Sequence, residues 1–207
     1  MKYLWKLSGI FGIMFGLAAG SPVLAQGGIS CALGAQAGYS MASSEISGTW
    51  LSVDGLSAKS RSPDFGLRTG CDYRIPTTPF AVGAFADYTW RDVAFQISTP
   101  GNAISMGLGS AWTIGGRVMY ADLVKGVSPY VGLGYTQTNL NLPAGVNLSS
   151  TLKGWKLIGG TEVALAKNLS LGLEGQWTKF DDIDLGAGFA MKPDAMTFMT
   201  RLSVVLN

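Results

Sequence analysis

FAVGAFADYTWR, residues 80–91, shows the clearest alternation of side chains in the sequence. Its even-numbered positions carry apolar side chains from Phe80 to Trp90, whereas its odd-numbered positions include Asp87 and Arg91. Successive side chains of a β-strand point to opposite faces, so this alternation predicts a strand with one apolar and one polar face. With seven further alternating stretches it predicts eight strands, at 31–42, 64–74, 80–93, 104–121, 129–139, 153–165, 169–180 and 196–206.

The joints between these strands alternate in length. The short ones are 75–79, 122–128 and 166–168, and the longer ones, which carry Gly, Ser, Asn, Asp and Pro, are 43–63, 94–103, 140–152 and 181–195. Short turns at one end and longer loops at the other are typical of outer-membrane barrels, with the turns in the periplasm. An even number of strands also closes the sheet, which hydrocarbon demands. We therefore expect an all-β fold, an eight-stranded antiparallel up-and-down transmembrane β-barrel.

The first 25 residues have the features of an export signal. Lys2 and Lys6 precede an apolar stretch at 10–17, and small residues follow up to Ala25. The apolar stretch is shorter than the roughly 20 residues of a spanning helix, which favours cleavage after Ala25 over a membrane anchor. We expect a cleaved signal peptide at 1–25 and an outer-membrane barrel domain at 26–207. Cleavage removes two of the 15 basic residues and none of the 13 acidic ones, so a basic surface for nucleic acid has no support.

Charged side chains fall on the face of the strands opposite the aromatics. An eight-stranded barrel has an interior that side chains just fill, and unpaired charges inside it are costly. We therefore expect an ion network that plugs the lumen, and an open pore is disfavoured. Its members are Arg68, Asp72, Arg74, Asp87, Arg117, Lys156, Glu162, Glu174 and Arg201, and with Arg91 the inward set holds six cations and four anions.

Tyr and Trp residues near the strand ends on the other face suit the headgroup level of a membrane, where a ring meets hydrocarbon and its polar tip meets water. A soluble barrel or sandwich with an aromatic core is the alternative, and the inward charges disfavour it. The expected aromatic girdle consists of Tyr39, Tyr73, Tyr88, Trp90, Trp112, Tyr120, Trp155 and Trp177.

Cys31 and Cys71 are the two cysteines, and both lie on the outward, aromatic-bearing face of their strands. Export places them in an oxidising compartment. If the first two strands form a hairpin, both cysteines lie near its open end, and we expect a cross-strand disulfide. The alternative is two small apolar side chains.

Three segments of the chain bear on its likeness to other proteins. They are GWKLIGGTEVALAKNLSLGLE at 154–174, GLRTGCDYRIPTTPFAVGAFADY at 66–88, and Gly115-Gly116-Arg117 leading through a turn to Pro129-Tyr130-Val131-Gly132. Together they resemble the small OmpA-like, opacity-type outer-membrane β-barrel family, particularly its alphaproteobacterial porin-like surface proteins. The resemblance places Gly160, Glu162 and Glu174 at family positions, the two glutamates facing inward. Such barrels commonly end in an aromatic residue that the assembly machinery reads, whereas this chain ends at Asn207.

Catalytic chemistry has little support, because the chain contains no histidine. Ser-His-Asp catalysis and His-ligated metal sites are therefore excluded. Glu162 and Glu174 could form an acid–base pair, but membership of the ion network is the favoured interpretation. An acidic cluster at 181–184 could bind a divalent cation that bridges lipopolysaccharide phosphates, although a solvated loop is favoured. We expect no enzyme, no cofactor and no metal site.

The whole pattern favours an integral envelope protein of the outer membrane of a Gram-negative bacterium, with surface loops available for binding or adhesion. We expect its partners to be outer-membrane lipid and lipopolysaccharide, the barrel assembly machinery and an unidentified surface ligand, but no nucleic acid. Two alternatives stay open: a narrow porin-like channel for ions or small solutes, and a binder of a small hydrophobic ligand. The loop residues singled out as candidates are Trp50, Asp181, Asp182 and Asp184.

Overall fold

The computed structural model describes residues 28–48, 56–91, 93–99, 102–121, 123, 126–141, 151–186 and 189–206. The expected signal peptide and Trp50 lie outside these residues. Among the described residues, no helix has the length and hydropathy needed to cross a membrane. The strands are β1 (Ile29–Gly48), β2 (Leu56–Arg74), β3 (Phe80–Trp90), β4 (Val93–Thr99), β5 (Asn102–Tyr120), β6 (Val127–Asn141), β7 (Thr151–Ala166), β8 (Leu169–Phe180), β9 (Ile183–Gly186) and β10 (Phe189–Leu206).

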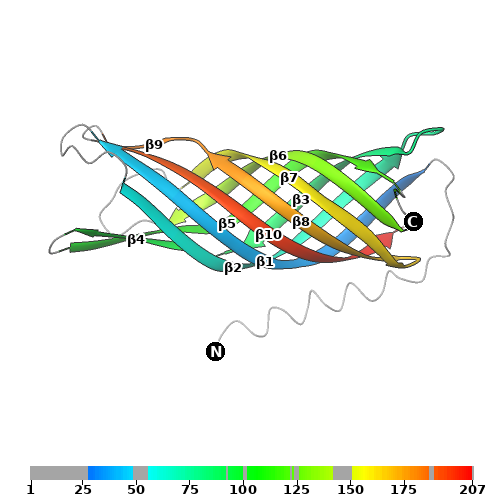
Figure 1. Cartoon of the computed structure of the whole chain (residues 1–207), viewed down its shortest axis with the longest axis horizontal. Helices are drawn as coiled ribbons and strands as arrows, with labels where there is room; N and C mark the ends of the chain where they lie inside the picture. The colour runs from blue at the N-terminus through cyan, green and yellow to red at the C-terminus, as the bar shows by residue number, and fades with distance from the viewer. Residues whose placement is uncertain are drawn as a thin grey trace, which may run out of the picture.

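Eight of these strands form a closed barrel (Figure 1). They pair in the order β1-β2-β3-β5-β6-β7-β8-β10, and β10 returns to pair with β1. Every pairing is antiparallel. Closure satisfies the backbone N–H and C=O groups within the sheet, as a hydrocarbon environment requires. The expected eight-stranded antiparallel barrel is thus confirmed.

The strands extend further at the loop end than the sequence predicted. β1 continues to Gly48 and β2 begins at Leu56, and β4 pairs with β5 in a hairpin where a loop at 94–103 was expected. The expected loop at 181–195 contains β9 and the first residues of β10, which pair with each other. For β1 and β2 the predicted loop bounds were wrong because the apolar alternation stops at their loop ends, whereas hydrogen-bonded pairing continues. An antiparallel sheet with water on both faces needs no apolar face.

The register of the pairs fixes the stagger of the barrel. From Cys31, each step to the register partner on the next strand leads around the barrel and returns to β1 at Met41. The residues met on the way are Cys71, Ala84, Gly116, Leu133, Leu157, Trp177 and Met196. The stagger is therefore ten residues, from position 31 to position 41. With about 3.3 Å of rise per residue and about 4.8 Å between strands, eight strands with this stagger tilt by about 40°. The tilt, visible in Figure 1, allows residues on different strands to be compared by their height in the membrane.

Candidate functional site: the charged lumen and the aromatic wall

The charged side chains inside the barrel form a chain of alternating sign. Arg68 lies at its centre, with Nη2 3.1 Å from Oδ2 of Asp87 and 2.9 Å from Oε1 of Glu174. Lys156 extends the chain on the loop side, with Nζ 3.5 Å from Oδ1 of Asp87. In order, the chain runs Lys156, Asp87, Arg68, Glu174, Arg201, Glu162, Arg117 and Asp72.

Glu174 of β8 is the most connected member of this chain. It accepts two hydrogen bonds from the Arg68 guanidinium, one of 2.6 Å from Tyr130 Oη and one of 2.5 Å from Gln176 Nε2. Its Oε2 also lies 3.5 Å from a guanidinium nitrogen of Arg201. Only 5% of Glu174 and 4% of Arg68 is exposed, so each charge depends on its protein partners in place of water.

Arg117 binds the charged residues of the lumen that lie nearest the turn end of the barrel. Its guanidinium donates to both carboxylate oxygens of Asp72, at 2.9 and 2.5 Å, and its Nη1 lies 3.0 Å from Oε1 of Glu162. The guanidinium carbon also lies 5.1 Å from the centre of the Tyr130 ring, within the range of a cation–π contact. Small residues make room here, since a Cβ on Gly160 would lie 2.8 Å from the Tyr130 hydroxyl.

Two residues change the predicted charge count. Arg74, the last residue of β2, is exposed, because the inward face opens to water where the barrel wall ends. Asp64, which the sequence analysis missed, is fully buried, with Oδ2 3.6 Å from Nε of Arg91. Ser40 also donates a hydrogen bond to this carboxylate. Without exposed Arg74 and with Asp64, the ion pairs inside the described part of the barrel involve five cations and five anions, whereas the sequence predicted six and four.

An apolar cluster lies inside the barrel on the loop side of the charges. Leu152 lies four residues nearer the loop end of β7 than Lys156, and Phe180 lies six residues nearer the loop end of β8 than Glu174. Both are buried, and so are the other members. This apolar cap was not predicted from the sequence, because most of these positions were expected in loops or at strand ends. Its residues are Ala42, Leu108, Leu140, Leu152, Phe180 and Ala195.

The outer wall carries the predicted aromatics. All eight are between 36% and 59% exposed. Six of them lie nearer the loop end of the wall. Together with Phe65, Tyr135 and Phe198, which the prediction omitted, they give each barrel strand at least one aromatic residue at this level. When the stagger is spread evenly over eight strands, these aromatics lie within about 4 Å of one height. This loop-side aromatic ring consists of Tyr39, Phe65, Tyr88, Trp90, Trp112, Tyr135, Trp155, Trp177 and Phe198.

A second aromatic level lies at the turn end of the wall. Tyr73 and Tyr120 lie there, and the Tyr120 ring meets that of Phe80 edge to face, with centroids 5.3 Å apart. Along the tilted strands, about nine residues separate this level from the loop-side aromatic ring, a height of about 22 Å. That height agrees with the apolar band of roughly 25 Å of outer-membrane barrels. Exposed side chains between the two levels include Ile114, Val118, Val131, Leu133, Leu157 and Leu173.

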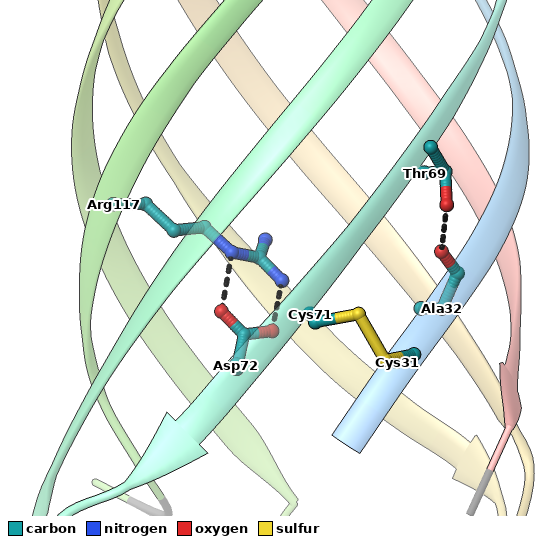
Figure 2. The surroundings of a disulfide bond; sticks show 6 residues. All are labelled: Cys31, Ala32, Thr69, Cys71, Asp72 and Arg117. Atoms are coloured by element: carbon teal, nitrogen blue, oxygen red, sulfur yellow. Dashed lines mark hydrogen bonds and ion pairs between the residues drawn. A yellow bond between two sulfur atoms is a disulfide. The ribbon is translucent and has the colours of Figure 1, made fainter. Parts of the chain in front are cut away.

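A disulfide joins Cys31 of β1 to Cys71 of β2, at positions that the register pairs directly (Figure 2). It lies on the outer side of the wall near the turn end. The next residue, Asp72, points the other way, toward Arg117 across the lumen (Figure 2). The alternation of a strand thus separates a lipid-side cross-link from the charges inside.

The acidic residues after β8 form no metal site in the described part of the chain, where no cluster of three or more Asp, Glu, Cys or His could hold an ion. Asp181 and Asp182 are exposed, and Asp182 Oδ2 lies 3.4 Å from Nζ of Lys192. Both partners of this pair are more than half exposed, so it contributes little to stability. Asp184 lies in β9, and its side chain is outside the described part.

A closed eight-stranded barrel, with an apolar wall between two aromatic levels and a charged interior, defines a transmembrane barrel of the bacterial outer membrane. Residues 13–201 match the model of the family described as "Outer membrane protein beta-barrel domain", and the chain belongs to this family. No curated protein matches the chain.

Three solved structures are similar to this chain at low sequence identity. Neisserial surface protein A has 19% identity and a TM-score of 0.45, with 83% of this chain and 96% of that chain covered. OprG from Pseudomonas aeruginosa has 14% identity and a TM-score of 0.48, with 88% and 99% covered. Ail, the attachment invasion locus protein of Yersinia pestis, has 12% identity and a TM-score of 0.46, with 88% and 100% covered. Family membership rests on the family model, not on these similarities.

Proposed function

We infer that this protein is a non-conducting anchor in the outer membrane that holds polypeptide segments at the cell surface. The observation that carries this inference is the interior of the barrel, where five cations and five anions pair beneath an apolar cap. Conduction needs a continuous path for ions and water. Side chains that cross the lumen and pair with one another occupy that path. A lumen cavity among the described residues, about 10 Å³ beside Arg68 and Arg201, has room for about one water molecule.

The surface role is supported by the strands that continue past the loop-side aromatic ring. β1 runs on from Tyr39 to Gly48, and the β4–β5 hairpin projects at the same end of the barrel (Figure 1). Segments that join such strands are held on a rigid base, which suits binding or adhesion. The proposed activity is binding, with no catalytic step.

The route to the membrane is also part of the proposal. We place cleavage of the signal peptide after Ala25, which N-terminal sequencing of the mature protein would test. The barrel assembly machinery would then act on β10, on which Phe198, Leu202, Val204 and Leu206 are exposed apolar residues of the outward face. Replacing Asn207 with Phe tests this step, since a faster rate of insertion would show that the machinery reads the residue that follows β10.

Planar-bilayer recording of the purified protein tests the closed lumen. The matched control is the triple variant Arg68→Ser, Glu174→Ser and Phe180→Gly, which removes one ion pair and part of the apolar cap. We expect no single-channel steps from the wild type and clear steps from the triple variant, which would show that the assay detects an opened barrel. Steps from the wild type would overturn the proposal and favour the narrow porin-like channel.

A further inference from the structure

The outer wall carries a groove at the height of the loop-side aromatic ring. It has a volume of about 270 Å³ and lies across β6, β7 and β8, between Leu133, Leu157 and the two tryptophans Trp155 and Trp177. Trp155 is 59% exposed and Trp177 is 45% exposed. In a membrane this groove faces lipid, and its apolar lining fits a hydrocarbon chain.

Basic residues stand at the loop-side edge of the groove. Lys179 lines it directly, and Lys153 lies on the adjacent strand, both of them exposed. Lys179 pairs in register with Trp155, so its ammonium group stands beside the ring of aromatics that marks the headgroup level. Within the described part of the chain, neither lysine forms an ion pair, whereas Lys192 is engaged with Asp182.

Asp181 shares the rim of the groove with Lys179. Its carboxylate accepts hydrogen bonds, so the rim offers both cationic donors and an anionic acceptor within one headgroup-sized area. A ligand that matches must combine a phosphate for the lysines with hydroxyl or amide groups for the aspartate, and an acyl chain for the groove. Lipid A, the anchor of lipopolysaccharide, combines these groups, and it occupies the leaflet on the loop side of an outer membrane.

From the groove toward the turn end of the barrel, the outer surface is not crowded by side chains where an acyl chain would lie. Gly159 pairs in register with Gly175, and a Cβ on Gly159 would have no atom within 4 Å. A second hollow, of about 350 Å³, lies there between Leu173 and Phe198. The apolar surface beneath the lysines therefore continues toward the middle of the membrane.

We propose that the face of β7 and β8 is a specific binding site for lipid A. The acyl chain lies in the groove between Trp155 and Trp177, and a phosphate is held by Lys179 and Lys153. The proposal rests on the membrane orientation of the proposed function, but it does not depend on whether the lumen conducts.

Native mass spectrometry of the detergent-purified protein tests the site, with diphosphorylated lipid A as the probe. The test variant is Lys153→Gln with Lys179→Gln. The matched control is Arg61→Gln with Lys167→Gln, which removes two exposed charges elsewhere. A basic residue near a charged lipid surface contributes about fivefold in affinity, so the test variant should bind about 25-fold more weakly, and the control should bind as the wild type does. Leu157→Trp, which fills the groove, should also weaken binding while leaving both lysines in place.

Two results would overturn the proposal. Equal binding by the test and control variants would place lipid A elsewhere, and equal competition by phosphatidylglycerol would make the ligand a phospholipid. Weaker binding of dephosphorylated lipid A would support the phosphate contact. A heat-dependent gel shift shows that each variant is folded, and bilayer recording of the same samples separates a failure of this site from a failure of the closed lumen.

Discussion

Replacing Glu174 with Gln should destabilise the barrel more than any other single neutralisation in the lumen. The substitution keeps the volume of the side chain but removes the charge that Arg68 and Arg201 both face. Removing one partner of a buried ion pair typically costs 3–5 kcal/mol. Arg68 keeps Asp87 and Arg201 keeps Glu162, so we expect the lower end of this range, about 3 kcal/mol.

The order in which the buried charges contact one another in the lumen predicts how double variants behave. Arg68→Met combined with Glu174→Gln removes two neighbours of opposite sign and leaves four cations and four anions, each still beside a partner. This double variant should cost about 2 kcal/mol less than the sum of its single variants, a coupling within the range seen for contacting residues. The matched double variant Asp72→Asn with Glu174→Gln removes two anions that are not in contact, and its cost should be close to additive.

Urea unfolding in detergent micelles measures these differences, with tryptophan fluorescence and migration on unboiled gels as two independent probes. The coupling, not the absolute stability, is the decisive quantity. A cost below about 1 kcal/mol for Glu174→Gln, or additive costs for Arg68→Met and Glu174→Gln, would contradict a buried network of paired charges. Water in the lumen would then solvate the charges, and the network could not close the barrel.

Three further predictions concern the wall. Reducing the disulfide should lower the stability of the barrel by at most about 4 kcal/mol, the chain-entropy value for a loop of 40 residues, as urea unfolding with and without reductant would measure. Val131→Arg, halfway down the apolar wall, should cost about 2–4 kcal/mol, whereas Asn139→Arg on the loop side of the same strand should cost less than about 1 kcal/mol; equal costs in lipid vesicles would contradict the membrane placement. Gly160→Val should cost about 1–3 kcal/mol by crowding the lumen tyrosine, whereas Gly159→Val, which faces open space, should be close to neutral; the reverse order in unfolding experiments would contradict the assignment of faces.

The direction in which each charge points could be predicted from the sequence, because the period of a strand is local. Asp87 and Lys156 sit opposite the aromatics of their own strands, and nothing beyond their own strand is needed to turn them inward. The pairs that they form could not be predicted in the same way. Lys156 meets Asp87 across the lumen because of the stagger of the whole barrel, and that stagger depends on the register of eight pairings at once.

The ends of the strands show where local reasoning stops. Arg74 has the same parity as Arg68, yet it lies where the wall ends and water can reach it. Asp64 has the same parity too, but the sequence analysis placed it at the edge of a loop, because the apolar pattern fades there. Its burial depends on β3, whose continuation supplies Arg91 at the same height. Burial at a strand end is thus set by the length of the neighbouring strands, which one strand's sequence does not contain.

The equal numbers of opposite charges bear on function more directly than their burial does. A lumen with an excess of one sign would favour ions of the other sign, which is how channels select. Here each of the five buried cations in the described lumen lies within 4 Å of a carboxylate, and the apolar cap lies between the charges and the loop end. The outer wall has the opposite character, since Lys153 and Lys179 lie beside an apolar groove with no ion-pair partner among the described residues. The charges inside the barrel are paired, whereas the two lysines on its outer wall are available to a ligand. This arrangement favours contacts with lipid and with the cell surface over the passage of ions through the barrel.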